Sequence, residues 1–191
     1  MDILLSPDAA DLQIIHRLRN QNLWAVEFAP WALSVMNSGG MAIVPLPPRG
    51  THTETLAPTN TLTMWAYTDL SDPRWTLGRK YIFLRQNPVC TTPQKLGVTV
   101  RDGWAAYARG GHLFVKTFAF VQGASYPDLG ASVEVFTDSR MLEVETLAPV
   151  VSLAPGGFVE HTERWRLLDG LPALTTEADV DQHVLPKVLG K

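Results

Sequence analysis

The sequence predicts an all-β fold, an antiparallel β-sandwich. Along most of the chain, apolar and polar residues alternate with a period of two, as they do in strands with one buried face. Turns containing Gly, Pro or Asn separate these stretches at the regular spacing typical of a sandwich. Charged residues make up only 18% of the 191 residues, which suits a chain rich in sheets.

The first strands are expected near the N-terminus. Residues 24–36 follow residues 11–21 after a short polar break, which predicts a hairpin. Pro30 predicts a bend in the second strand, because proline cannot donate a ladder hydrogen bond. Residues 38–50 combine a glycine turn with prolines, which predicts an irregular loop. The first strand presents four side chains on one face: Leu12, Ile14, His16 and Leu18.

The remaining strands follow at short intervals, and only the end of the chain has a helical pattern. Residues 61–69 alternate, with aromatic side chains on one face. Residues 80–118 predict a β-meander, and residues 132–168 predict the last strands. Residues 178–189 predict a helical turn or two within a short C-terminal tail, 176–191.

Composition limits the classes of function. The length predicts one domain, 1–191, with a core of its own. Cys90 is the only cysteine, so neither a disulfide framework nor a zinc knuckle is expected, and the predicted location is cytoplasmic. The net charge of -3 comes without a basic stripe, and no apolar run reaches the roughly 18 residues of a membrane span. We therefore expect neither nucleic acid nor membrane as a partner.

Common catalytic motifs are absent from the sequence. It contains no glycine-rich phosphate loop, no GxSxG elbow and no HExxH helix. No two histidines have the spacing of metal ligands, so no metal site is expected. His16 and His161 are interpreted as ordinary core or surface residues of their strands. Candidates for function therefore come from polar residues on the strand faces.

Glu143 and Glu145 are the first candidates. Residues two apart in a strand point to the same face, about 7 Å apart, and Met141 and Leu147 lie beside them there. Paired acids can divide the roles of general acid and general base, because repulsion and partial burial separate their pKa values. A solvated outer face explains the pair as simply.

Two further groups also have two interpretations. His112 and Lys116 share a face of the strand HLFVKTF, with Phe114 between them, and would suit a concave polar site; the alternative is a sheet edge with a buried lysine stem. Aromatic faces can stack on sugar rings, although tryptophans also simply fill sandwich cores. The candidate platform residues are Trp31, Trp65, Trp75 and Trp104.

The segment SVEVFTDSRMLEVETLAPVVSLAPGGFVEHTERWRLL resembles the C-terminal region of galactose mutarotase-like (aldose 1-epimerase-like) proteins. In that family, a strand ending in Glu-Thr, a short excursion, a Pro-Gly turn and a long returning strand close the β-supersandwich. Stretches such as EFAPWAL, PLPPRG, NTLTMWAYTD and YPD are similar, in this order, to those of uncharacterised bacterial members. The chain looks like the C-terminal two-thirds of such a protein, without some N-terminal strands.

The resemblance implies acid-base chemistry on a carbohydrate without a cofactor. The family's base, which takes the proton of the anomeric hydroxyl, stands in a Glu-Thr pair, and Glu145-Thr146 is the matching pair here. The family's acid at the ring oxygen is a histidine in the motif Asn-His-x-Tyr-Phe-Asn-Leu. The nearest counterpart, residues 29–33 (APWAL), lacks it. His112 or Lys116 could take its place.

The resemblance also bears on sugar contacts and assembly. A sandwich that lacks strands exposes edges and an apolar face, so we expect a homodimer or larger homo-oligomer. Asp128 and the pair Arg79-Lys80 lie in turns, where capping or surface roles fit equally well. The expected substrate-binding residues are Trp31, Trp65, Arg79, Asp128 and Glu143.

Hypotheses from different classes follow. The first is a mutarotase-like isomerase acting on a free sugar or sugar acid, with Glu145 as base. The second is a non-catalytic carbohydrate-binding module; an accessory domain of a polysaccharide lyase or glycosidase is a third, by analogy of fold alone. Pro30 at the place of the histidine favours the binding module, and the Glu145-Thr146 pair favours the enzyme.

Overall fold

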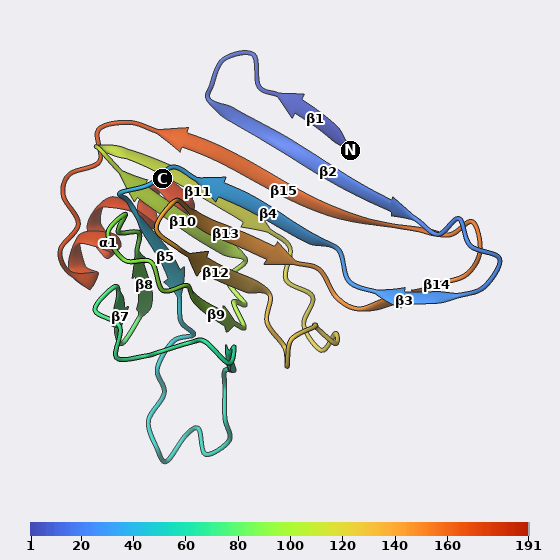
Figure 1. The fold of residues 1–191 in the computed structure, drawn as a ribbon, viewed down its shortest axis with the longest axis horizontal. Helices are drawn as coiled ribbons and strands as arrows, with labels where there is room; N and C mark the ends of the chain where they lie inside the picture. The colour runs from blue at the N-terminus through green and yellow to red at the C-terminus, as the bar shows by residue number, and fades with distance from the viewer. Residues whose placement is uncertain (191) are drawn as a thin grey trace.

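The chain is nearly all β in a computed structural model that describes residues 1–190. Over this range the strands form three antiparallel sheets, and two short helices lie at the C-terminal end (Figure 1). The predicted all-β class is confirmed. None of the helices in the described range is long and apolar enough to cross a membrane.

The large sheet contains eight of the strands found in residues 1–190, in the spatial order β1-β2-β15-β11-β10-β5-β8-β7. Every neighbouring pair in it is antiparallel. Its strands are β1 (Asp2–Leu5), β2 (Asp11–Arg19), β5 (Met41–Pro45), β7 (Trp75–Leu77), β8 (Tyr81–Arg85), β10 (Trp104–Arg109), β11 (His112–Phe118) and β15 (Phe158–Leu168).

The small sheet packs on one face of the large sheet and has the spatial order β4-β13-β12-β9-β6. Its strands are β4 (Trp31–Met36), β6 (Leu62–Met64), β9 (Gln94–Val98), β12 (Val133–Thr137) and β13 (Leu142–Leu147). A separate ladder joins β3 (Val26–Phe28) to β14 (Val151–Leu153). The core between the two sheets consists of alternating apolar residues, such as Val44 and Leu84 from the large sheet and Leu96 and Val144 from the small sheet.

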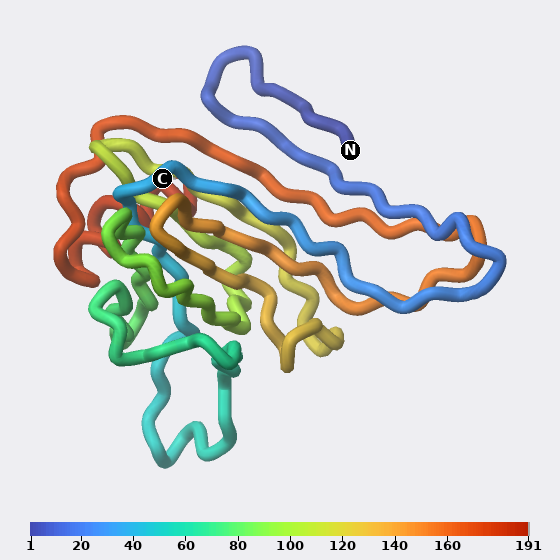
Figure 2. The backbone as a smooth tube through the Cα atoms, viewed as in Figure 1, coloured from blue at the N-terminus to red at the C-terminus, as the bar shows by residue number. Residues whose placement is uncertain are grey.

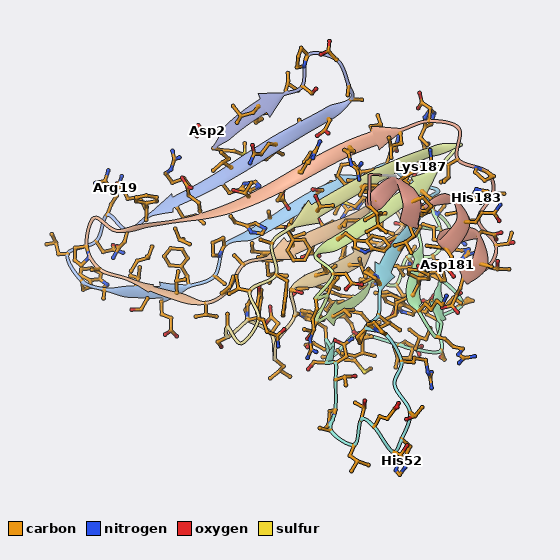
Figure 3. All side chains as sticks on the ribbon, turned by 180° about the vertical axis from the view of Figure 1, so that it is seen from behind. Asp2, Arg19, His52, Asp181, His183 and Lys187 are labelled. Carbon is orange, nitrogen blue, oxygen red and sulfur yellow. The ribbon has the colours of Figure 1, made fainter. Side chains whose placement is uncertain are left out.

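The helices cover the other face of the large sheet. They are α1 (Glu177–His183) and α2 (Leu185–Val188), and Figure 3 shows Asp181, His183 and Lys187 on them. Thr176 caps α1 in a capping box with Asp179. Val180 and Val184 are fully buried against the sheet. The helical pattern predicted within the tail 176–191 is confirmed for its described residues.

Several local predictions are wrong. Residues 80–118 do not form a β-meander, because β8 and β9 lie in different sheets and only β10 and β11 pair as consecutive strands. Residues 38–50 are not a loop throughout, because they contain β5, an interior strand of the large sheet that is buried on both faces. Its continuous apolar run lacks the alternation of a half-exposed strand, and Pro45 is tolerated because it ends the strand. The hairpin predicted between residues 11–21 and 24–36 is also absent: β2 pairs with β1 and β15, whereas β4 pairs with β13. The break at Pro30 separates β3 from β4, as predicted.

The ends of β2 and β15, with β3 and β14, extend beyond the rest of the molecule as an arm, residues 19–28 and 151–158 (Figure 2). Several large apolar side chains of the arm are exposed: Leu23, Trp24 and Phe158. β1 lies at one edge of the large sheet, beside β2.

Candidate acid-base site

β13 places two polar clusters on the two faces of the small sheet. Glu145 and Thr146 are neighbours in this strand and therefore point to opposite faces. The outer cluster, on the face turned away from the large sheet, consists of Trp31, Trp65, Lys95, Glu134 and Glu145. The inner cluster, between the sheets, consists of His16, Lys116, Thr146, His161 and Glu163.

The outer cluster has a lysine at its centre. Glu134 on β12 is in register with Glu145 on β13. Lys95 Nζ lies 2.7 Å from Glu134 Oε2 and 3.0 Å from Glu145 Oε2. Trp31 Nε1 donates a hydrogen bond of 2.7 Å to Glu145 Oε2. One cation thus joins two carboxylates from adjacent strands.

Aromatic rings surround this lysine. Lys95 Nζ lies 4.9 Å from the ring centroid of Trp31 and 4.7 Å from that of Trp65, within the range of cation-π attraction. Gly97 lies under Trp65 and makes room for the neighbouring Ala131 side chain, because a Cβ there would lie 2.9 Å from Ala131 Cβ and 3.4 Å from Trp65 Cη2. Trp31 is 52% exposed, so the rings meet solvent while both glutamates are buried.

Burial sets the protonation of the outer cluster. Burial raises the pKa of Glu134 to about 8; Lys95 opposes this rise, while the charge of Glu145 and the neighbouring Asp128 carboxyl add to it. Burial lowers the pKa of Lys95, but the two carboxylates outweigh this effect and the pKa ends above its ordinary value. Burial and the charge of Glu145 raise the pKa of Glu143.

The outer cluster has more acceptors than donors. Glu134 is 1% exposed and Glu145 is 0% exposed. Within residues 1–190, no donor forms a hydrogen bond with Oε1 of either glutamate. A buried carboxylate oxygen without a partner costs free energy that a ligand hydroxyl would recover.

The inner cluster is fully paired by comparison. Glu163 Oε1 accepts from Lys116 Nζ at 2.7 Å and from the Thr146 hydroxyl. Glu163 Oε2 contacts His16 Nε2 at 3.0 Å and accepts from Trp165 Nε1 at 3.2 Å. Burial raises the pKa of Glu163, but the charge of Lys116 and these hydrogen bonds outweigh it and lower the pKa.

Lys116 and His161 complete the inner cluster. Lys116 Nζ also donates to Ala32 O at 2.9 Å and Ser34 Oγ at 3.0 Å, and burial lowers its pKa. Burial lowers the pKa of His161 to about 4, so the ring is neutral near pH 7. Because the Thr146 hydroxyl donates to Glu163, His161 Nε2 must carry the proton that it shares with Thr146 Oγ1 across 2.8 Å.

The structure brings some of the predicted site residues together and separates others. Trp31, Trp65 and Glu145 belong to the outer cluster, Glu143 lies on the same face, and Asp128 contacts Glu134. Full burial of Glu145 excludes the solvated interpretation for that residue.

The other candidates lie elsewhere. Lys116 is on the opposite side of β13 from Glu145, in the inner cluster. His112 is exposed and pairs with Asp169 at 2.7 Å. Arg79 lines a separate cavity of about 690 Å³ beside α1. Trp75 and Trp104 are buried in the core, as in the alternative interpretation of these residues.

Lys95 and Glu134 were not predicted from the sequence. Each alternates with apolar neighbours in its strand, as a surface residue would. They meet Glu145 only because β9, β12 and β13 are adjacent in the small sheet, and strand order is not visible in the alternation. In the described part of the chain, no three His, Cys, Asp or Glu residues are grouped closely enough to hold a metal ion.

Comparisons with known proteins identify the fold. No protein-family model matches the sequence. No curated protein matches it either. A structure described as a "putative aldose 1-epimerase" from Klebsiella pneumoniae superposes on 97% of this chain, with a TM-score of 0.61 and 11% sequence identity. The two proteins share a fold. The predicted antiparallel β-sandwich is thereby confirmed as the fold.

The extent of the match is limited to part of the other protein. The chain covers 48% of the Klebsiella protein, about half of its length. Two further structures match 84% of this chain with a TM-score of 0.47. One is the Slr1438 protein from Synechocystis sp. PCC 6803, covered over 51% of its chain at 11% identity. The other is described as a "putative aldose 1-epimerase" from Escherichia coli K12, covered over 57% of its chain at 13% identity.

Proposed function

We propose that the protein binds a free sugar or sugar acid at the outer cluster and interconverts its anomers, with Glu145 as the base. The observation that carries this proposal is the pair of buried carboxylate oxygens without donors, Glu134 Oε1 and Glu145 Oε1, beside the exposed Trp31 and the partly buried Trp65. The shared fold with a protein described as an aldose 1-epimerase supports it.

A sugar fits this combination of groups. Its hydroxyls can donate to the two glutamate oxygens that have no donor, and its CH faces stack on aromatic rings such as Trp31 and Trp65. Glu143 on the same face and Asp128 beside Glu134 add further acceptors at the rim. Sites for small molecules commonly combine apolar walls with few polar groups in this way.

Glu145 is positioned to accept a proton. Trp31 and Lys95 hold its Oε2, which fixes the carboxylate and leaves Oε1 for the anomeric hydroxyl. Access requires Trp31 or Lys95 to move, because Glu145 is 0% exposed. Rotamer changes of exposed side chains take picoseconds to nanoseconds, far faster than turnover.

Proton NMR tests this proposal directly. Freshly dissolved aldoses and uronic acids are mixed with the protein, and anomer exchange and saturation transfer are followed in the same tube. We expect faster exchange with the wild type, and exchange at the uncatalysed rate but continued saturation transfer with Glu145→Gln. Glu27→Gln, an exposed glutamate on β3, is the matched control and should behave as the wild type. Wild-type exchange no faster than buffer would refute the enzymatic proposal.

A non-catalytic binding module is the second candidate. Pro30 stands at the junction of β3 and β4, where the resembling family has its histidine acid, and this observation favours it. The same NMR experiment separates the two functions. Saturation transfer that weakens with Trp65→Ala, without accelerated exchange, would indicate binding alone.

Self-association also remains a proposal, as does the cytoplasmic location. The exposed Leu23 and Trp24 on the arm support an interface between copies. Sedimentation velocity over a range of protein concentrations should show a larger species that Trp24→Ser weakens. A monomer at all concentrations would contradict it.

A further inference from the structure

We infer that Glu134 is the acid of the outer cluster and supplies the proton that complements the base Glu145. The inference rests on the proposed function and assigns its second catalytic residue. It begins from position: Glu134 and Glu145 are direct register partners on β12 and β13, so their Cβ atoms lie about 5 Å apart on one face. Both also contact the same Lys95 Nζ.

Each of the two glutamates keeps one oxygen without a donor. Each glutamate uses Oε2 for Lys95, and each Oε1 is buried without a donor from residues 1–190. Neither Lys95 nor the nearby Tyr67 gives up a proton readily, because the pKa of each lies above its ordinary value: the glutamates raise that of Lys95, and burial raises that of Tyr67.

The charges around Glu134 favour the protonated form of its carboxyl group. The groups near it are Lys95 on β9, Glu145 on β13, Asp128 from the turn before β12 and Tyr67 from the turn after β6. One lysine cannot neutralise two buried carboxylates, so protonation of one of them is favoured. Burial, Glu145 and Asp128 all favour the protonated form of Glu134 and raise its pKa to about 8. A protonated carboxyl at pH 7 can donate to a ligand, whereas a carboxylate can only accept.

Asp128 offers a route for the proton to solvent. It is exposed, and its backbone lies in the left-handed region at φ 49°, followed by Leu129 at φ 62°. Thr63 Oγ1 on β6 fixes this turn by donating to Asp128 O at 2.6 Å. The turn therefore holds an exposed carboxyl against a buried one.

The proton transfers balance. During ring opening the anomeric O–H proton passes to Glu145, the carbonyl forms, the bond between C1 and the ring oxygen breaks, and the ring oxygen takes the proton of Glu134. After rotation about the C1–C2 bond, Glu134 takes that proton back as the ring closes, and Glu145 returns its proton to the new anomeric oxygen. Both residues end as they began, and no other reactant is needed.

The test is the pH profile of anomer exchange for the wild type and Glu134→Gln, measured by proton NMR with an aldose that the wild type converts. Glutamine keeps the shape of a protonated glutamate and cannot give a proton. We expect a loss of about 100-fold or more in the exchange rate, with saturation transfer retained, as for removal of a general acid. The wild-type rate should fall as pH rises through about 8, and Glu134→Asp should recover part of the rate.

Each outcome is decisive. No exchange by the wild type would refute the proposed function and this inference with it. An active wild type with Glu134→Gln within about threefold of its rate, or with an unchanged pH profile, would refute only this inference. Loss of saturation transfer together with exchange would also refute it, because Glu134 would then be a binding group. Circular dichroism of each variant confirms that it is folded.

Discussion

The outer and inner clusters differ in how completely their charges are paired, although only the thickness of β13 separates them. The inner cluster has one lysine for one glutamate, and both oxygens of Glu163 are filled by donors. The outer cluster has one lysine for two glutamates, and one oxygen of each lacks a donor in the described range. Burial alone therefore does not mark a site here; an excess of buried acceptors beside exposed aromatic rings does.

The difference follows from where each cluster lies. Most of the inner cluster is enclosed between the sheets, where an unpaired charge would be too costly to persist, and a cavity of about 170 Å³ reaches only its His16 and His161. The outer cluster is covered only by side chains, and Trp31 is half exposed. Its unmet acceptors can be satisfied when a ligand replaces those side chains.

The largest expected effect comes from breaking the inner pair. Lys116→Met leaves Glu163 buried without its cation and should lower the free energy of unfolding by about 3–5 kcal/mol. Lys95→Met is the matched change in the outer cluster and should cost less, because Glu134 and Glu145 can share a proton in place of the cation. Urea unfolding followed by circular dichroism compares them. An equal loss for the two variants would contradict the contrast.

The pH dependence of the free energy of unfolding should reveal the raised pKa of Glu134. Its pKa is raised on folding from 4.5 to about 8, so its contribution is fully present below pH 4.5 and is lost as pH rises towards 8. Over this window the free energy of unfolding of the wild type should fall relative to Glu134→Gln by at most about 1.4 kcal/mol per pH unit. Parallel curves for the two proteins between pH 5 and 8 would show that Glu134 is already ionised.

A smaller effect is expected from the donor that holds Glu145. Trp31→Phe keeps a ring over Lys95 but removes the Nε1 hydrogen bond to Glu145, at a cost of about 1.5–2 kcal/mol. Because the freed carboxylate loses its fixed orientation, anomer exchange should slow while sugar binding remains. Chemical unfolding measures the loss of stability, and the exchange assay measures the rate of anomer exchange. If Trp31→Phe exchanged anomers at the wild-type rate, the role of Trp31 would be limited to covering the buried carboxylates.

The sequence predicted part of this site for physical reasons. Alternation placed Glu143 and Glu145 on one face, and the Glu-Thr motif marked Glu145. The alternating pattern does not show whether other side chains bury the polar face of a strand. A solvent-exposed Glu145 was therefore compatible with the sequence. Nor does it show strand order, and Lys95 and Glu134 join Glu145 only through pairing across β9, β12 and β13.

The same limits explain the separation of His112 from Lys116. They share a face of β11, but four residues of strand place them about 13 Å apart, one at an exposed end and the other between the sheets. The fold class, in contrast, follows from the period-two pattern over the whole chain. β5 does not show the period-two pattern, because both of its faces are buried and its residues are apolar throughout.

The most direct test of the contrast uses the indole groups as reporters. Trp31 Nε1 donates to Glu145 in the outer cluster, and Trp165 Nε1 donates to Glu163 in the inner cluster. A titration with aldoses and uronic acids, followed by the indole signals in ¹H-¹⁵N correlation spectra, compares the two clusters in one sample. We predict that the signals of Trp31 and Trp65 shift with ligand while that of Trp165 stays in place. A shift of Trp165 alone, or of no indole at all, would contradict the assignment of the outer cluster as the ligand site.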